Sequence, residues 1–380
     1  MTPALTVHEV TDAARLVDLH DEWDAFVASS PDGSFFETYE WLTTWLACFW
    51  APRQPAFMFV RDGGRLVGLA PFLPDDTGDA WCRRSLTLPV HSHVPRANLV
   101  AADGMRAAVV DALLAHASDR HGWTPLVFPQ VDRASAAWAA IEDGARRQGR
   151  GVTQWEDMVV PWIRLDGDWD GYLQSRTAHV RQEMRRKRRK LEKAGRVEYA
   201  VTSTPRECAT AINDIFAIEA KSWKQDEGTS FATEVGVSAF YTTLARLAAE
   251  RGWLRLYVMS LDGAPIAHVY GIVHRNEYLA LKTSYDQSFR ELSPGSVLFE
   301  FAVRDACEQG YTAFDMLGIE ARWKNDLATD ARRLASACLI APASLRCQSC
   351  RSYENTLKPY LKTHAPWLAA LKQRITRATA

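Results

Sequence analysis

Runs of apolar and polar residues divide the chain into two halves that share one order of elements. In each half, two apolar runs flank a short turn that contains Asp-Gly, a pattern typical of a β-hairpin. The first hairpin covers residues 56–60 and 66–72, and the second covers 253–261 and 265–273. After each hairpin, a stretch with helical periodicity leads into another apolar run, which predicts a helix and a strand. The repeated order indicates a duplicated fold, although two unrelated α/β segments would give the same pattern.

The other apolar periodicities predict further helices and strands around these hairpins. Predicted helices cover residues 36–50, 103–116, 133–148, 175–194, 205–220 and 238–250. Predicted strands cover residues 125–128, 158–165, 197–202, 278–285, 312–317 and 334–340. The alternation of helices and strands favours a mixed α/β fold. We expect an N-terminal lobe at 1–165, a linker at Asp166–Tyr172 that leads into a C-terminal lobe at 166–342, and a helical tail at 343–380.

The stretch Glu277–Lys324 places two charged residues in apolar strands, on either side of a distinctive helix start. The charged residues are Lys282 and Asp315, and between them Ser293-Pro294-Gly295 opens an amphipathic helix. Serine at the cap and proline at the first helical position make a strong helix start. Backbone amides that no side chain covers can bind an anion at such a helix start, and the helix dipole favours this binding. The same three residues also occur in ordinary helix caps that bind no ligand. The first half lacks Ser-Pro-Gly before its helix, which indicates that the second half carries the function.

The composition bounds the class of protein. The chain has 380 residues, 47% of them hydrophobic, and a formal net charge of −1, which gives no overall attraction to nucleic acid or membrane. We expect neither a secretory signal nor a membrane span of ~20 apolar residues. The seven cysteines are scattered and odd in number, which favours a cytoplasmic protein over a disulfide framework. Cys347 and Cys350 have metal-site spacing but no second ligand pair nearby, so we expect two free thiols and no metal.

A concentrated basic segment departs from this neutral average. A predicted helix carries eight lysines and arginines between Arg181 and Lys193, against Glu183 and Glu192. It can be a solvated face with i,i+4 pairs, for example Glu183 with Lys187. It can also bind the phosphates of a nucleotide-activated or lipid-linked acceptor, or hold tRNA. The density of positive charge favours an anionic partner over a solvated face.

Several residues of the second half occur in a characteristic order. They are Trp223-Lys224, Lys282, Ser284-Tyr285-Asp286, Ser293-Pro294-Gly295, Asp315 and Lys324. In these residues the chain resembles the CelD/BcsL-type acetyltransferases of bacteria, which belong with the tandem GNAT proteins and are related in fold to the FemAB peptidyltransferases. The resemblance implies two GNAT-like lobes, each a mixed central sheet flanked by helices, with a degenerate N-terminal lobe. It also implies an acyl-CoA donor, acetyl-CoA or longer, in the C-terminal lobe.

The sequence departs from standard GNAT enzymes at the phosphate loop. Those enzymes have an Arg/Gln-rich Gly-x-Gly run, whereas this chain has only Ser-Pro-Gly, with Arg290 just ahead. FemAB-like relatives use aminoacyl-tRNA as the donor, so that donor stays an alternative. The residues expected to bind the donor are Arg290, Ser293, Pro294, Gly295 and Ser296.

Acyl transfer also needs a base for the acceptor and a proton for the leaving thiolate. Asp315 is the first candidate base. A carboxylate in an apolar strand is costly to bury, so it is expected to have a function or a charged partner. Lys282 could be that partner, in which case the two form a structural ion pair. His268 is the second candidate base, and its alternative is a satisfied core histidine. Tyr285 could protonate the thiolate or serve only for packing.

The remaining candidates are expected to hold the acceptor. An aromatic face beside a charge suits an acidic or sugar-like molecule, whereas lysines that snorkel at the surface are the plain alternative. The candidate acceptor-binding residues are Trp223, Lys224, Lys282, Asp286 and Lys324.

Together these observations predict an acyl-CoA-dependent N- or O-acyltransferase. The acceptor, a small or sugar-linked molecule, would attack the thioester directly, without a covalent enzyme intermediate. Two alternatives remain at this stage. One is an aminoacyl-tRNA-dependent transferase that forms amides, and the other is a non-catalytic GNAT scaffold in polysaccharide biosynthesis.

Overall fold

The computed structural model describes residues 5–76, 84–89, 91, 96–222 and 236–341. The chain forms two compact units. Unit 1 contains the residues up to Glu37, Gln54–Met158 and those from Arg333 onward, and unit 2 contains Thr38–Arg53 and Val159–Arg332. Two strands, β7 (Gly151–Arg164) and β13 (Asp330–Ile340), pass from one unit to the other.

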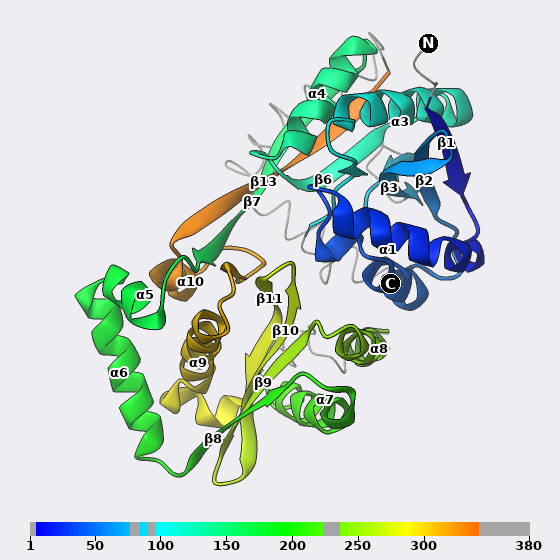
Figure 1. Cartoon of the computed structure of the whole chain (residues 1–380). Helices are drawn as coiled ribbons and strands as arrows, with labels where there is room; N and C mark the ends of the chain where they lie inside the picture. The colour runs from blue at the N-terminus through cyan, green and yellow to red at the C-terminus, as the bar shows by residue number, and fades with distance from the viewer. Residues whose placement is uncertain (1–4, 77–83, 90, 92–95, 223–235, 342–380) are drawn as a thin grey trace, which may run out of the picture. The chain divides into compact units, whose positions relative to one another are not determined.

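Unit 1 is built on a mixed sheet with helices packed against it (Figure 1). Its strand order is β1 (Thr6–Val10), β2 (Ala56–Asp62), β3 (Arg65–Asp75), β4 (Ser85–Thr87), β6 (Leu126–Asp132) and β13, with β5 (Val100–Ala101) on β3. Its helices are α1 (His20–Ser29), α3 (Arg106–His121) and α4 (Ala136–Arg147). The core lies between the sheet and α3 and α4, where residues such as Phe72, Val109 and Trp138 are buried. The predicted hairpin of the first half is confirmed as β2 and β3.

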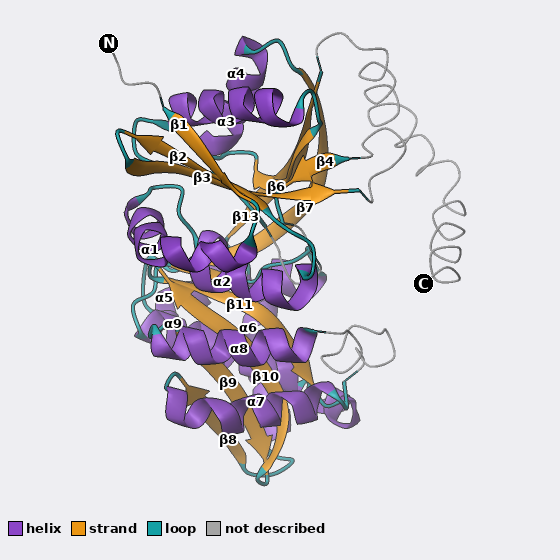
Figure 2. Cartoon of the chain, turned by 90° about the vertical axis from the view of Figure 1, so that its right-hand side faces the viewer, coloured by secondary structure: helices purple, strands orange, loops and turns teal. Residues whose placement is uncertain are grey.

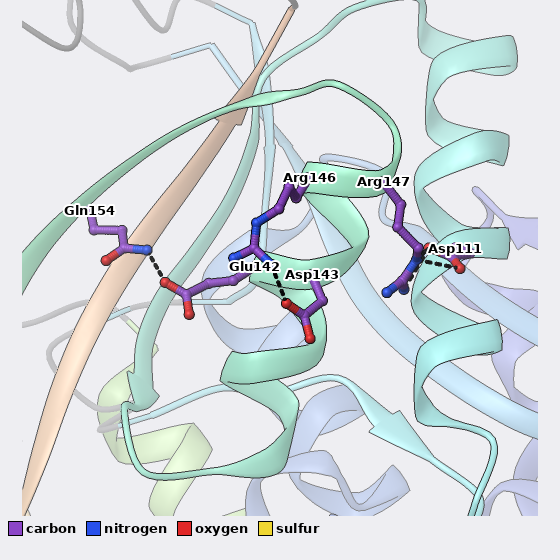
Figure 3. A network of polar contacts seen from close by, with 6 residues as sticks. All are labelled: Asp111, Glu142, Asp143, Arg146, Arg147 and Gln154. Carbon is purple, nitrogen blue, oxygen red and sulfur yellow. Dashed lines mark hydrogen bonds and ion pairs between the residues drawn. The ribbon is translucent and has the colours of Figure 1, made fainter.

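The outer surface of α3 and α4 carries a set of ion pairs (Figure 3). Arg147 of α4 reaches Asp111 of α3 at 2.9 Å, and Arg146 pairs with Asp143 one turn away at 2.7 Å. The side chains of all these groups are more than a third exposed, so each pair contributes little to stability. Helices α3 and α4 are therefore held mainly by their buried faces.

Unit 2 is built on a second mixed sheet. Its strand order is β7, β12 (Ala313–Asp315), β11 (Glu277–Tyr285), β10 (Ala264–His274), β9 (Leu254–Leu261) and β8 (Val197–Thr202). Its helices are α2 (Tyr39–Trp45), α5 (Trp169–Ser175), α6 (Ala178–Glu192), α7 (Pro205–Glu219), α8 (Val237–Glu250), α9 (Pro294–Glu308) and α10 (Arg322–Leu327). The second predicted hairpin is confirmed as β9 and β10.

The helices of unit 2 cover both faces of its sheet. Helices α7 and α8 lie on one face, and α9 lies on the other with α6 packed on its outer side (Figures 1 and 2). Helix α9 is fixed to the sheet through Asp305, which accepts hydrogen bonds from Arg255 and Tyr257 of β9. Helix α6 buries Val180, Met184 and Leu191, which recur at near-helical spacing along an otherwise charged helix.

Three sequence-based predictions are wrong in detail. The strand predicted at 158–165 begins earlier than expected, because β7 covers Gly151–Arg164. The predicted linker Asp166–Tyr172 contains the start of helix α5, capped by the side chain of Asp168. On α6, Glu183 pairs with Arg186 at 2.8 Å, and Lys187 instead reaches across to α9.

The mixed α/β fold class is confirmed. The predicted C-terminal tail, together with Cys347 and Cys350, lies outside the described residues. The cysteines 48, 208, 307 and 338 are free thiols. Within the described parts of the chain, none of the helices combines the length and hydrophobicity needed to span a membrane.

Candidate functional site

The central strands of unit 2 separate next to helix α9. Strands β11 and β12 are parallel and pair only between Glu277–Leu279 and Ala313–Asp315. Beyond Leu279, β11 continues to Tyr285, whereas β12 ends and its chain turns away. The described strands include no partner for that half of the β11 edge. Its backbone groups are therefore available to a bound molecule, because strand edges carry amides and carbonyls that need partners.

The turn that carries the chain away from β11 is held by Lys324. Leu317 and Gly318 both adopt positive φ, 48° and 60°. The Lys324 ammonium donates hydrogen bonds to the carbonyls of Leu317 and Ile319, the second at 3.0 Å. Lys324 lies in helix α10, which was not among the helices predicted from the sequence. The lysine expected to bind the acceptor thus holds the loop that keeps the two strands apart.

Helix α9 begins beside the gap with its first turn uncapped by any side chain. Ser293 is the N-cap residue, as predicted, but its φ is +55° and its hydroxyl makes no capping bond. Pro294 occupies the first position, and the first turn contains no acidic residue. A Cβ added to Gly295 would lie 3.1 Å from the ring of Tyr285, so glycine allows the helix start to sit against the end of β11. Within this turn the amide of Ser296 donates to the carbonyl of Ser293 at 3.1 Å, and Pro294 has no amide proton. The amide of Gly295 is therefore the candidate backbone donor for a ligand.

Helix α6 brings a positive charge to the same helix start. The ammonium of Lys187 lies 3.3 Å from the hydroxyl of Ser296, in the first turn of α9. A cation near a helix N-terminus is unfavourable, because the helix dipole is positive there. The contact therefore favours an anion that both groups would bind. Arg290, also predicted to meet the donor, has a side chain that is 65% exposed and lies 3.6 Å from Glu291.

Two cavities meet at Ser296 and Trp323. The first, of about 340 Å³, is lined by the end of β11 and the start of α9, including Thr283, Ser284, Tyr285 and Gly295. The second, of about 390 Å³, lies between α6, α9 and α10 and includes Lys187 and Arg322. Trp323 belongs to both cavities and packs edge-on against Phe299 at 5.0 Å. The two cavities are called here the groove, because both are lined by residues of the first turn of α9.

The other face of the sheet carries buried polar residues. His268 of β10 contacts Glu219 of α7 at 3.0 Å, and their side chains are 0% and 1% exposed. The ammonium of Lys282 lies 5.6 Å from the ring of Tyr241 in α8. These contacts place His268 and Lys282 on the face covered by α7 and α8, opposite the α9 groove.

Asp315 lies on that same face and has a basic partner. Its neighbour Phe314 packs on Phe299 of α9, and successive strand residues point to opposite faces. The carboxylate of Asp315, which is 0% exposed, accepts hydrogen bonds from the guanidinium of Arg332 and from the amide of Leu317. Arg332 therefore forms an ion pair with Asp315, for which the sequence had suggested Lys282 as a possible partner.

The remaining sequence-predicted residues have the following positions. Asp286 accepts hydrogen bonds from the amide and hydroxyl of Ser288 and lies 3.6 Å from Lys221, so it caps the short helical turn after β11. Trp223 and Lys224 lie outside the described residues. The structure therefore brings Tyr285, Gly295 and Ser296 together at one cavity and places Asp315, Lys282 and His268 on the opposite face.

Three residues of this region were not predicted from the sequence, namely Lys187, Glu219 and Arg332. Trp323 was predicted to border a cleft together with Lys324, and it lines both cavities. Lys187 lies among seven other basic residues of its segment, and nothing local distinguishes it from them. Glu219 had a usable signal, since it is an acid on the apolar face of a predicted helix, where an unpaired charge would be costly.

The burial of Lys324 makes stability depend on pH in a defined direction. Desolvation lowers the pKa of Lys324 to about 8, with Asp315 acting in the opposite direction. Because the folded-state pKa lies below the unfolded value, the unfolded chain binds more protons between pH 8 and 10, and stability rises with pH there. We expect wild-type protein to gain stability relative to Lys324→Met as the pH is raised from 7 to 10, measured by urea unfolding. A constant difference across that range would contradict the lowered pKa.

Residues 178–325, which include the separated strands and the helix start beside them, match the family model described as Acetyltransferase (GNAT) domain. The resemblance inferred from the sequence is thereby confirmed. No curated protein matches the chain at a significant level.

Two solved structures share the fold over most of the chain. The structure of FemX is 14% identical, with a TM-score of 0.60, and the match covers 89% of this chain and 98% of FemX. A conserved protein of unknown function from Bacteroides thetaiotaomicron is 15% identical, with a TM-score of 0.56 and coverage of 85% and 97%. At these identities the likeness shows the fold alone.

Proposed function

We propose that unit 2 is an acyl-CoA-dependent N- or O-acyltransferase in which the donor lies in the groove around the start of α9. The supporting observation is the meeting of an uncapped helix N-terminus with the Lys187 ammonium at 3.3 Å from Ser296. This arrangement suits the diphosphate of a CoA thioester, since backbone amides and a lysine both bind phosphate. Gly295 supplies the backbone amide of this site and Ser296 its hydroxyl, because the amides of Ser293 and Ser296 already donate to the carbonyls of Arg290 and Ser293.

The free edge of β11 fits the rest of such a donor. The pantetheine arm of CoA contains amide groups, which can pair with an exposed strand edge in the manner of an added strand. Beyond Leu279, β11 offers this edge up to Tyr285. The thioester would then lie in the gap between β11 and β12, with Tyr285 close enough to the cavity to protonate the leaving thiolate.

The acceptor would approach the gap from the face covered by α7 and α8. An amine or hydroxyl there attacks the thioester carbonyl, the new N–C or O–C bond forms, and the C–S bond breaks to release CoA. Of the two candidate bases, we favour His268. Both carboxylate oxygens of Asp315 already accept hydrogen bonds, from Arg332 and Leu317, which supports a structural role for that residue. Lys282, with Trp223 and Lys224, remains a candidate for acceptor binding.

A second function is favoured by the outer face of α6. Arg185, Arg189 and Lys193 are exposed and recur every four residues, about 6 Å apart along the helix. Arg186 and Arg188, by contrast, are paired with Glu183 and Glu300. Such a row of cations suits a phosphate backbone, as in the donor of an aminoacyl-tRNA-dependent transferase. A nucleotide-linked acceptor would use the same charges.

One experiment separates the donors. Purified protein is incubated with acetyl-CoA and a panel of amino sugars, amino acids and diamines, and released thiol is measured. In parallel it is incubated with aminoacylated tRNA, with and without ribonuclease. Thiol release that depends on the acceptor and resists ribonuclease supports the acyl-CoA enzyme. Transfer only from charged tRNA would instead support the aminoacyl-tRNA-dependent transferase and contradict the acyl-CoA enzyme. That transfer should be abolished by ribonuclease and weakened in the double variant R185Q/R189Q.

We also propose that the protein is cytoplasmic. The free thiols of the described cysteines fit a reducing compartment, which is also where we place the donor. A non-catalytic scaffold in polysaccharide biosynthesis would give neither thiol release nor aminoacyl transfer in the experiment above.

A further inference from the structure

The His268–Glu219 pair is a costly feature that the fold alone does not require. Its side chains are 0% and 1% exposed, and the imidazole Nε2 lies 3.0 Å from Glu219 Oε1. A buried carboxylate is expensive unless a strong hydrogen-bond donor faces it. With Nε2 donating its proton to Glu219, the lone pair of the neutral ring lies on Nδ1. The carboxylate thereby fixes both the tautomer and the orientation of the imidazole.

Ser284 adds a second, independent feature next to this pair. It is 3% exposed, and its hydroxyl has no hydrogen-bond partner among the described residues. A buried hydroxyl left without a partner costs about 1–3 kcal/mol. Ser284 and His268 are Cα partners in the antiparallel pair of β11 and β10. Directly opposed residues put their side chains on the same face, about 5 Å apart at Cβ.

Ser284 also lies at the gap where transfer would occur. It lines the cavity of about 340 Å³ formed with the start of α9, and it belongs to the half of β11 that has no partner on the β12 side. His268 sits one strand further from the gap, and Glu219 lies beyond it on α7. The three groups therefore follow one another from the gap into the protein.

We propose that Ser284, His268 and Glu219 form a proton relay that removes the acceptor's proton. As the acceptor nitrogen or oxygen bonds to the thioester carbon, its proton passes to Ser284 Oγ. The Ser284 hydroxyl, which makes no hydrogen bond to His268 in this structure, turns toward His268 Nδ1 and passes its own proton to that nitrogen. The imidazolium is stabilised by Glu219, and the C–S electrons leave with the CoA thiolate. Ser284 touches the acceptor, whereas Glu219 acts through His268 as a positioning residue. This inference rests on the proposed function.

The relay predicts that the loss of kcat in the relay variants depends on the basicity of the acceptor. Ethylenediamine is largely protonated at neutral pH and needs a base, so its transfer should depend on the relay. Hydroxylamine is already neutral, and its adduct loses a proton to water easily. We expect Ser284→Ala to lower kcat for ethylenediamine about 100-fold and for hydroxylamine less than threefold, with the KM for acetyl-CoA unchanged. Glu219→Gln should show the same selectivity, and Ser284→Thr should restore most of the rate.

The controls separate the relay from folding and from the proposed function. Thr202→Val removes a buried hydroxyl from β8, three strands away, and should leave both rates unchanged. Calorimetric titration with CoA reads donor binding in every variant. Equal losses with both nucleophiles, or no loss in Ser284→Ala, would overturn the relay and leave the proposed function standing. Wild-type protein that binds CoA but transfers to neither nucleophile would overturn both the relay and the enzyme assignment.

Discussion

Replacing Gly295 by valine should abolish donor binding. A Cβ at this position lies 3.1 Å from the ring of Tyr285, and the branched valine carbons would extend into the cavity that both residues line. They would also stand between the first-turn amides of α9 and a bound phosphate. We expect the affinity for acetyl-CoA to fall at least 100-fold, which is about 2.7 kcal/mol, as measured by calorimetry.

A matched glycine tests whether this effect is local. Gly167, in the same unit, has open space where its Cβ would be, so Gly167→Val should bind acetyl-CoA as the wild type does. Thermal unfolding of both variants shows whether the fold survives. Undiminished binding by a folded Gly295→Val protein would exclude the helix start as the donor site.

Removing Arg332 should cause the largest loss of stability. Its guanidinium forms an ion pair with Asp315, whose side chain is 0% exposed, and Arg332→Met would remove that ion pair from a buried carboxylate. Breaking a buried pair by removing one partner costs about 3–5 kcal/mol. We expect a decrease of this size in the free energy of unfolding, measured by urea denaturation followed by tryptophan fluorescence.

Two further variants test the cause of that loss. Arg304 and Glu308 form an exposed ion pair one helical turn apart on α9. Arg304→Met removes this pair and should change the free energy of unfolding by less than about 0.5 kcal/mol. The double variant Arg332→Met/Asp315→Leu removes both buried charges and should recover much of the loss. If Arg332→Met has the same free energy of unfolding as Arg304→Met, the ion pair between Arg332 and Asp315 does not stabilise the fold.

Local sequence signals predicted the elements well where periodicity and turn chemistry agreed. The strand at 197–202 and the helix that starts at Pro294 have the predicted bounds, because each is framed by residues with strong backbone preferences. Strand β7 was underestimated, since its first half contains charged and polar residues that hide the apolar alternation. A strand held by partners on both sides tolerates such residues, which local patterns cannot show.

The site itself depended on contacts that no local pattern contains. Lys187 and Ser296 are 109 residues apart in the sequence, and His268 and Glu219 are 49 apart. Asp315 was recognised as a charge that needed a partner, but the choice between Lys282 and Arg332 depends on the sheet register. Which side chains share a face became clear only once α7, α8 and α9 were placed on the sheet of unit 2.

The central claim is that acyl-CoA binds at the start of α9 with the help of Lys187. Calorimetric titration of acetyl-CoA into wild-type protein, Lys187→Met and Lys190→Met tests it most directly, since Lys190 is a lysine of the same helix that contacts the carbonyl of Glu291 instead. We predict wild-type binding with a dissociation constant below about 1 mM, a loss of about tenfold for Lys187→Met, and no change for Lys190→Met. Absence of binding by the wild type, or equal binding by Lys187→Met, would contradict the claim.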